Sequence, residues 1–232
     1  MTHRRREVSR VEGFSDAVFG FAVTLLVVSL EVPKTFDDLL VMMRGFPAFA
    51  ASFAMLFQVW WRHYRFFRRY DLEDSYVIRL TGLLLFVVLF YVYPMKFLWS
   101  VFFGPFVGNA ESHVIAPRQV PTLFIVYGLG IAAAYLILAA LYRHAYVLRE
   151  ALALTPLELV DTRIEIYRSA GIACVALLSV AIAGVCAAFA PNLVGIAGYA
   201  YVLIGVSETL IGSYGGRLRA RLRAQSEGDE AR

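Results

Sequence analysis

Residues 10–33 read RVEGFSDAVFGFAVTLLVVSLEVP. A polar start that includes Asp16 is followed by a long apolar run, which ends at Glu31 and Pro33. A helix needs about 20 mostly apolar residues to cross a bilayer, and the run from about Phe14 to Leu30 approaches that length. No small-x-small cleavage site follows, so the pattern predicts a retained first transmembrane helix and not a signal peptide.

The whole chain of 232 residues shares this apolar character, with 59% hydrophobic and 17% charged residues. Soluble domains average about 25% charged residues, so the composition excludes a soluble domain, and its apolar richness excludes a disordered chain. The two cysteines, Cys174 and Cys186, are too few for a disulfide scaffold. They lie in one predicted helix about 18 Å apart, too far for a bridge, and we interpret them as packing residues.

Six segments are long and apolar enough to span a membrane, and continuous apolar runs favour helices over a barrel. The second contains Arg44, the sixth contains Glu208, and the third is interrupted by Pro94 and Lys96. We expect one all-α integral membrane domain over residues 1–223 and a polar, disordered C-terminal tail over 224–232. The approximate spans are Phe14 to Leu30, Leu39 to Trp61, Val77 to Trp99, Pro121 to Tyr142, Ser169 to Ala190 and Leu193 to Ser213.

Basic residues predict the orientation of these spans. Most of the 22 Lys and Arg residues fall at the N-terminus, in alternate connections and in the C-terminal tail, within segments 4–10, 62–79, 143–168 and 217–232. The positive-inside rule then predicts that both termini are cytoplasmic. The net charge of +4 is explained by membrane orientation, without nucleic acid as a partner. We interpret the C-terminal arginines as a solvated cytoplasmic face, with RNA binding or specific lipid binding as the alternative.

No motif of catalysis or metal binding is present in the sequence. It has no phosphate-binding loop, no Gly-x-Ser-x-Gly and no His-Glu-x-x-His, and its four histidines lack metal-ligand spacing. We therefore expect no enzyme activity, no cofactor and no resident metal. The alternatives to a channel are an ion-coupled secondary transporter, which the lack of an internal repeat opposes, and a membrane enzyme acting on lipid substrates. The enzyme would need clustered carboxylates or histidines.

The first helix combines an apolar stripe with a separate acidic group. At 100° per residue, a 4-3-4-3 spacing places five apolar residues on one face. Thr24 lies about 60° from Phe21, on the flank of this stripe, and Asp16 lies about 140° from Phe21. The stripe either lines a pore or packs against lipid or a neighbouring helix, and the pattern alone leaves both open. The five residues are Phe14, Val18, Phe21, Leu25 and Val28.

Several of these residues resemble the signature of the transmembrane protein 175 family, which comprises endolysosomal and bacterial potassium channels. The first helix carries the similar motif Arg-x-x-x-Phe-Ser-Asp at Arg10, Phe14, Ser15 and Asp16, followed by Thr24-Leu25-Leu26-Val27. The end of the second span is similar to that family's Trp-x-x-His pattern at Trp60, His63, Phe67 and Asp71. Pro94 resembles its proline late in the third helix, and the remaining three helices match in number and hydrophobicity.

The resemblance implies a bacterial member with one six-helix unit per chain, in the bacterial inner membrane. It implies a homotetramer whose central pore is lined by the first helix and conducts K⁺, with other monovalent cations as further candidates. The Thr-Val-Gly-Tyr-Gly filter of ordinary potassium channels is missing from this sequence. The matching hydrophobic constriction is Phe21, Leu25 and Val28, with Thr24 beside it. Phe21 stands where the family usually carries Ile or Leu.

The residues Arg10, Phe14, Ser15, Asp16, Trp60 and His63 are then expected to form a structural motif. We hypothesise that Asp16 pairs within its own subunit with polar groups of the second and third spans, because buried polar groups persist when they are satisfied. Trp60 and His63 are the candidate neighbours. The alternative is that Asp16 attracts cations at the entrance of the pore.

Overall fold

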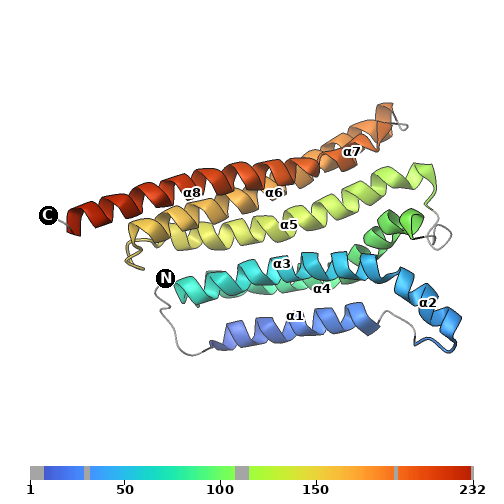
Figure 1. The fold of residues 1–232 in the computed structure, drawn as a ribbon, viewed down its shortest axis with the longest axis horizontal. Coiled ribbons are helices and arrows are strands. Elements are labelled where there is room, and N and C mark those ends of the chain that lie inside the picture. The colour runs from blue at the N-terminus through green and yellow to red at the C-terminus, as the bar shows by residue number, and fades with distance from the viewer. Residues whose placement is uncertain (1–7, 29–31, 108–114, 191–192, 231–232) are drawn as a thin grey trace. The chain divides into compact units, whose positions relative to one another are not determined.

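The computed structural model describes residues 8–28, 32–107, 115–190 and 193–230, and the regular elements within these ranges are all helical. The chain divides into two compact units, residues 1–120 and 121–232 (Figure 1). Five helices are long and apolar enough to cross a membrane, or six if one bent pair counts as a single span. The predicted all-α membrane fold is therefore confirmed.

The first unit is built around three long helices. Helices α1 (Arg10–Val28), α3 (Phe46–Tyr70) and α4 (Ser75–Phe103) pack against one another (Figure 1). The shorter α2 (Phe36–Arg44) precedes α3. The unit also contains two short turns of 3-10 helix, at Gly104–Phe106 and Pro117–Gln119.

The second predicted span is broken, and not the single helix expected from Leu39 to Trp61. Helices α2 and α3 meet at Gly45 with a bend of 46°. The start of α2 is fixed by a reciprocal cap between the side chains and backbone of Thr35 and Asp38. Pro47 stands in the first turn of α3, where its missing N–H costs no hydrogen bond. Hydropathy detects apolar length but not these start and stop signals.

A short turn joins α3 to α4 within the first unit. Asp71 ends α3 with a left-handed φ of 52°, a conformation that Asp tolerates better than most residues. Asp74 then accepts hydrogen bonds of 2.9 Å from the backbone N–H groups of Tyr76 and Val77, which caps α4. From there α4 runs to Phe103 without a break through Pro94, so the residues that interrupt the apolar run do not interrupt the helix.

The second unit contains α5 (Val120–Val147), α6 (Pro156–Phe189), α7 (Ile196–Tyr199) and α8 (Val202–Glu230). Helix α6 packs along α8 and against α7, and α5 approaches α6 closely at Gly128. The predicted sixth span is divided between α7 and α8. The backbone of α8 continues to Glu230, whereas the composition after Ala224 predicts disorder. The residues from Ala224 to Glu230 include Ala, Gln and two Glu, which are good helix formers.

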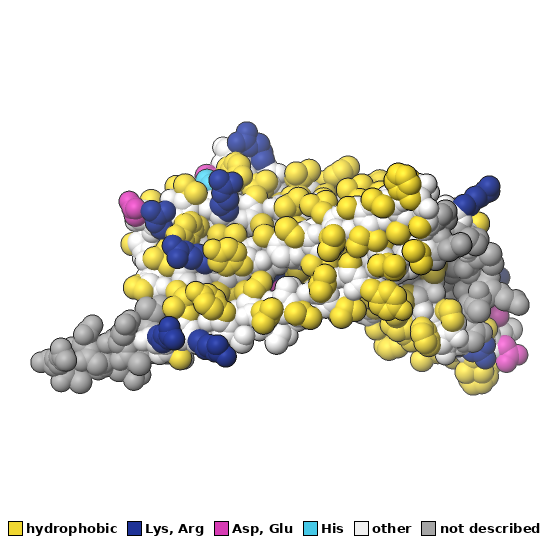
Figure 2. Space-filling view, turned by 90° about the horizontal axis from the view of Figure 1, so that it is seen from above, with side chains coloured by type: hydrophobic (Ala, Val, Ile, Leu, Met, Phe, Trp, Pro, Cys, Tyr) yellow, Lys and Arg dark blue, Asp and Glu magenta, His cyan; other side chains and the backbone are white. Residues whose placement is uncertain are grey.

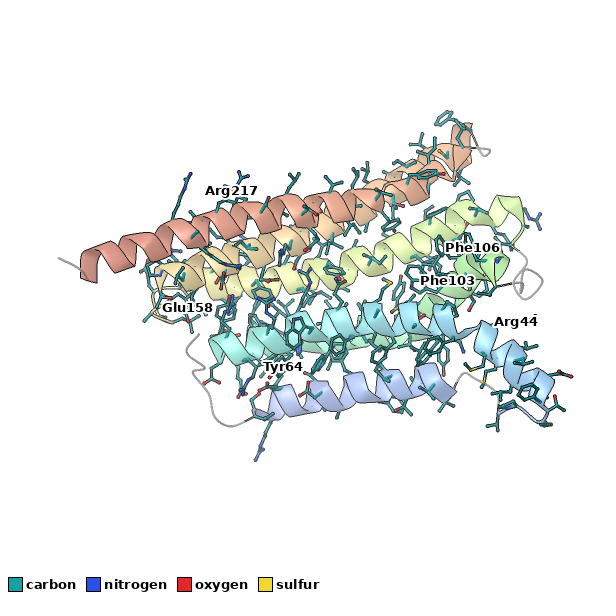
Figure 3. The ribbon with its side chains drawn as sticks, in the orientation of Figure 1. Arg44, Tyr64, Phe103, Phe106, Glu158 and Arg217 are labelled. Atoms are coloured by element: carbon teal, nitrogen blue, oxygen red, sulfur yellow. The ribbon has the colours of Figure 1, made fainter. Side chains whose placement is uncertain are left out.

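Both units expose many large apolar side chains among the described residues. Figure 2 shows hydrophobic side chains over the middle of one face, with Lys and Arg gathered mainly toward one end. Large side chains such as Phe90 on α4 and Val185 on α6 are exposed. In the first unit, Arg44 lies toward the same end as Phe103, and Tyr64 lies toward the other (Figure 3). An exterior of this kind is suited to lipid, which does not require polar surface.

Candidate functional site

Most of the predicted site lies on α1, which has two distinct faces. One face packs toward α3 and α4. Its buried residues recur every three or four positions, as expected for a helix with one covered side. These residues are Glu12, Ser15, Phe19, Ala22 and Leu26.

The predicted apolar stripe lies on the other face of α1 or at its border. The side chains of Phe14, Phe21 and Val28 are 64%, 57% and 69% exposed, and Val18 and Leu25 are half-buried. The stripe therefore contains large apolar side chains that the first unit leaves uncovered. This face of α1 is available to lipid, to water or to a second copy of the chain.

Thr24 adds a polar group to the flank of this apolar surface. Its side chain is exposed, and its Oγ1 donates a hydrogen bond of 3.0 Å to the carbonyl oxygen of Gly20. A bond to the carbonyl four residues back satisfies a threonine hydroxyl inside a helix where water is absent. Thr24 thus occupies the flanking position that its helical angle predicts.

Asp16 faces the interior of the first unit and not the stripe. Its Oδ1 accepts a hydrogen bond of 2.8 Å from Nε1 of Trp60 on α3, which is the contact within one subunit that the sequence hypothesis expected. The indole is held by its neighbours on α3, because the rings of Phe57 and Tyr64 lie 5.2 Å and 5.3 Å from it between centroids. A carboxylate acceptor makes such a bond stronger than one between neutral groups.

His63 lies at the junction of the three long helices of this unit. It is buried, and its Nε2 lies 3.3 Å from Oγ1 of Thr81 on α4. The ring of Phe19 from α1 packs 5.9 Å from the imidazole, and that of Phe67 packs 4.9 Å from it. The sequence contains a signal for Thr81, since it is a polar residue one turn after Val77 in an apolar run, but sequence reasoning missed it.

The remaining motif residues divide between the two faces of α1. Ser15 is buried and donates a hydrogen bond of 2.7 Å to the carbonyl oxygen of Val11. Arg10 begins the helix and is exposed, as is Phe14. Ser15 and Asp16 therefore belong to the packed side of the motif, and Arg10 and Phe14 do not.

The second unit contains ion pairs that sequence reasoning did not assign. Nε of Arg219 on α8 lies 2.6 Å from Oδ1 of Asp161 on α6, and Nε of Arg168 on α6 lies 3.3 Å from Oε2 of Glu208 on α8. Charged groups on spanning helices are costly unless they are paired, so these pairs join α6 to α8. Over the described ranges, no three His, Cys, Asp or Glu side chains are grouped so that they could hold a metal ion.

Comparison with known proteins gives consistent similarities. Residues 10–91 match a family model described as endosomal/lysosomal potassium channel TMEM175. A protein of Marivirga tractuosa named "Potassium channel" is 38% identical over 187 residues, which cover 77% of this chain and 76% of that protein.

Two solved structures are also similar. The crystal structure of a variant of the potassium channel MtTMEM175, in complex with a nanobody-MBP fusion protein, has a TM-score of 0.80 at 34% identity, over 93% of this chain and 97% of that one. A lysosomal potassium-selective channel TMEM175 homolog from Chamaesiphon minutus has a TM-score of 0.54 at 23% identity, over 87% and 96% of the two chains. This second match shows similarity of fold.

Proposed function

The chain belongs to the TMEM175 family of potassium channels, and from that premise we propose that its K⁺ pathway is lined by the exposed face of α1. The family and the names of the relatives support a multi-pass membrane channel for potassium and not an enzyme. The finer proposal is a homotetramer with both termini in the cytoplasm. In it, α1 helices from neighbouring copies surround a central pore.

The observation that carries this proposal is the exposure of large apolar side chains on α1, opposite its packed face. Phe21, Leu25 and Val28 occupy successive turns and extend about 10 Å along the helix. An apolar ring of this kind in a narrow pore excludes water, and conduction stops until the ring widens. The three residues therefore form the proposed hydrophobic constriction, with the hydroxyl of Thr24 beside it.

Asp16 is assigned a structural role in this proposal. Its hydrogen bond to Trp60 supports a carboxylate that anchors α1 to α3 and does not attract ions at the pore entrance. Asp16 and Phe21 lie about 140° apart around the helix. When Asp16 is held against α3, Phe21 therefore points away from the interior of the subunit. The buried contact between His63 and Thr81 braces the same three helices.

Selectivity is proposed to arise without a cage of backbone carbonyls. The sequence contains no Thr-Val-Gly-Tyr-Gly segment, whose carbonyl oxygens replace the hydration shell of K⁺ in ordinary potassium channels. Side chains of α1 therefore take the place of that filter. The bulk of Phe21 makes the aromatic ring the first candidate for the narrowest point.

The test is ion flux through purified protein in liposomes that carry a K⁺ gradient and no gradient of H⁺ or Na⁺. Passive K⁺ flux is the expected result, whereas a transporter requires a coupling ion. Light scattering of the detergent-solubilised protein should give the mass of a tetramer. A folded tetramer without K⁺ flux would overturn the proposed function, and a folded monomer would overturn the shared pore.

A further inference from the structure

Tyrosine and arginine side chains gather on the second unit where α5 ends. Nε of Arg163 on α6 donates a hydrogen bond of 3.0 Å to the phenol oxygen of Tyr146 on α5, and Nη2 donates to the same oxygen. The guanidinium carbons of Arg163 and Arg149 lie 5.1 Å and 5.3 Å from the centroid of the Tyr146 ring. We name these residues, with Tyr167 of α6 and Tyr214 of α8, the tyrosine–arginine patch.

The second unit does not neutralise the charge of this patch. Arg163 is exposed, and no carboxylate among the described side chains pairs with it. Arg149 contacts the adjacent Glu150 at 3.3 Å in an exposed pair, which contributes little because water screens it. On the same helix α6, Arg168 is paired with Glu208, so Arg163 is the arginine of this helix without a carboxylate partner among the described side chains.

Further arginines extend the positive charge on either side of the patch. Arg143 lies one turn before Tyr146, and Arg217 lies one turn after Tyr214. Both are exposed, and neither has an ion-pair partner within the described ranges. In Figure 3, Arg217 extends away from the α8 ribbon, and Glu158 at the start of α6 lies toward the same end of this unit. A polyanion or an anionic surface thus meets several uncompensated guanidinium groups.

Tyrosines supply the other half of the patch. Tyr167 lies one turn after Arg163 on α6, and Gly215, next to Tyr214, closely approaches Ile164, next to Arg163. Tyr167 and Tyr214 are 58% and 66% exposed. Their apolar rings and polar hydroxyls suit the boundary between membrane and water, where tyrosine is enriched. An arginine fork donates two parallel hydrogen bonds to a phosphate. The patch therefore combines phosphate donors with ring faces that tolerate lipid.

Apolar side chains border the patch toward the membrane-spanning parts of its helices. Leu210 and Val206, one and two turns before Tyr214 on α8, are 64% and 50% exposed. Soluble phosphate or RNA would not use such a border, whereas acyl chains pack on it. The positive-inside rule places this basic end toward the cytoplasmic leaflet, which contains anionic lipids.

We propose that the tyrosine–arginine patch binds the phosphate group of an anionic phospholipid in the adjoining leaflet. Arg163 donates to the phosphodiester oxygens through the Nη1 and Nη2 hydrogens that its bonds to Tyr146 do not use. Arg149 donates beside it, and the hydroxyls of Tyr167 and Tyr214 complete the donor set. The acyl chains lie along the apolar border at Leu210. The test of this site is independent of the proposed pore, because it measures lipid binding and not ion flux.

The test uses full-length protein in a neutral detergent, with phosphatidylglycerol or phosphatidylcholine of identical acyl chains added to the micelles. Native mass spectrometry counts the retained lipids, and thermal unfolding reports the stabilisation. We expect phosphatidylglycerol to be retained preferentially and to raise Tm more than phosphatidylcholine does. The double variant Arg149→Gln/Arg163→Gln should weaken apparent phosphatidylglycerol affinity by about 30-fold, because each of the two arginines near an anionic surface contributes about 1 kcal/mol.

Two further variants separate a local site from general charge and from misfolding. Lys34→Gln/Arg118→Gln removes the same charge from exposed positions in the first unit and should keep the lipid preference. Arg163→Lys keeps the charge and removes the fork, so it should fold normally and bind phosphatidylglycerol more weakly than the unmodified protein does.

Three outcomes would overturn the site. The first is equal retention of the two lipids by the unmodified protein. The second is equal loss of lipid preference in the control double variant and the patch double variant. The third is equal protection by inorganic phosphate, soluble RNA and phosphatidylglycerol, which would show an anion site without lipid recognition.

Discussion

The indole N–H of Trp60 and the carboxylate of Asp16 are 2.8 Å apart between nitrogen and oxygen, and they link α3 to α1. Helices in a bilayer gain little from the hydrophobic effect, because lipid tails are as apolar as the side chains. Hydrogen bonds and close packing therefore hold them together. The Asp16–Trp60 bond fixes the rotation of α1 about its own axis, and with it the direction of the apolar stripe.

Replacing the donor of this bond tests its contribution. Trp60→Phe keeps an aromatic ring but leaves Asp16 without the indole N–H, so we expect a lower Tm and poorer tetramer recovery. A double-mutant cycle with Asp16→Asn should give a coupling free energy of about 1 kcal/mol, since hydrogen bonds between membrane helices reach about 0.6–1.7 kcal/mol.

The exposed neighbour Trp61 supplies the matched control, because Trp61→Phe should leave Tm nearly unchanged. Strict additivity of the Asp16 and Trp60 variants would contradict the anchor. Intact tetramers of Asp16→Asn with reduced conductance would instead support the role of Asp16 as a cation-attracting residue at the pore entrance.

The buried partner of His63 gives a second prediction. Thr81→Val preserves shape and removes the hydroxyl 3.3 Å from the imidazole, so a buried polar ring loses its partner. We expect a loss of about 1–3 kcal/mol in the free energy of unfolding, measured by denaturation in detergent. Thr209→Val changes an exposed threonine on α8 and should have a much smaller effect. Equal effects of the two variants would show that the His63–Thr81 contact contributes nothing.

The two contacts show what the sequence can and cannot predict about this site. The pairing of Asp16 with Trp60 is predictable, because the angle of Asp16 on α1 and the resemblance in the second span point to the same interior. The partner of His63 is not predictable: Thr81 stands out as a polar residue in an apolar run, but its contact with His63 depends on the register of α3 against α4. Local hydropathy contains no information on that register.

The constriction can be tested with a substitution at its bulkiest position. Phe21→Ala shortens an exposed apolar side chain in the proposed pore, so water should enter more easily and passive K⁺ flux should rise several-fold in liposomes. Phe90→Ala removes a similarly exposed ring from α4 and should leave flux unchanged. If both variants conduct like the unmodified protein, Phe21 is not the barrier to K⁺. Contact with lipid is then the better interpretation of this face of α1.

Close packing in the second unit supports a fourth prediction. A Cβ at Gly128 on α5 would collide with Val180 and lie 3.0 Å from the carbonyl oxygen of Ala176, both on α6. Gly128→Ala should therefore cost about 1–3 kcal/mol, as overpacking typically does. At Gly184 on α6, a Cβ would meet nothing within 4 Å, so Gly184→Ala should be neutral or slightly stabilising. Thermal unfolding of the two variants is compared. A lower Tm for Gly128→Ala alone would support close packing of α5 on α6, and equal Tm values would contradict it.

Breaks within the predicted spans are the harder feature to predict. A hydropathy window reads residues 39–61 as one apolar run, although Thr35 and Asp38 cap one helix and Pro47 begins another. The short α7 is a similar case, since its junction with α8 lies inside an apolar segment. In both places the helix ends depend on a few backbone hydrogen bonds, to which average hydrophobicity is insensitive.

The hydrogen bond from the hydroxyl of Thr24 to the carbonyl of Gly20 determines whether that hydroxyl can act as a donor or as an acceptor toward other molecules. Its single hydrogen is used by the backbone, so the oxygen offers its lone pairs to the exposed side of α1. Such an oxygen is a Lewis base with no proton to give. Around a shared pore axis, a ring of these oxygens would favour cations over halide anions, although the ring carries no formal charge.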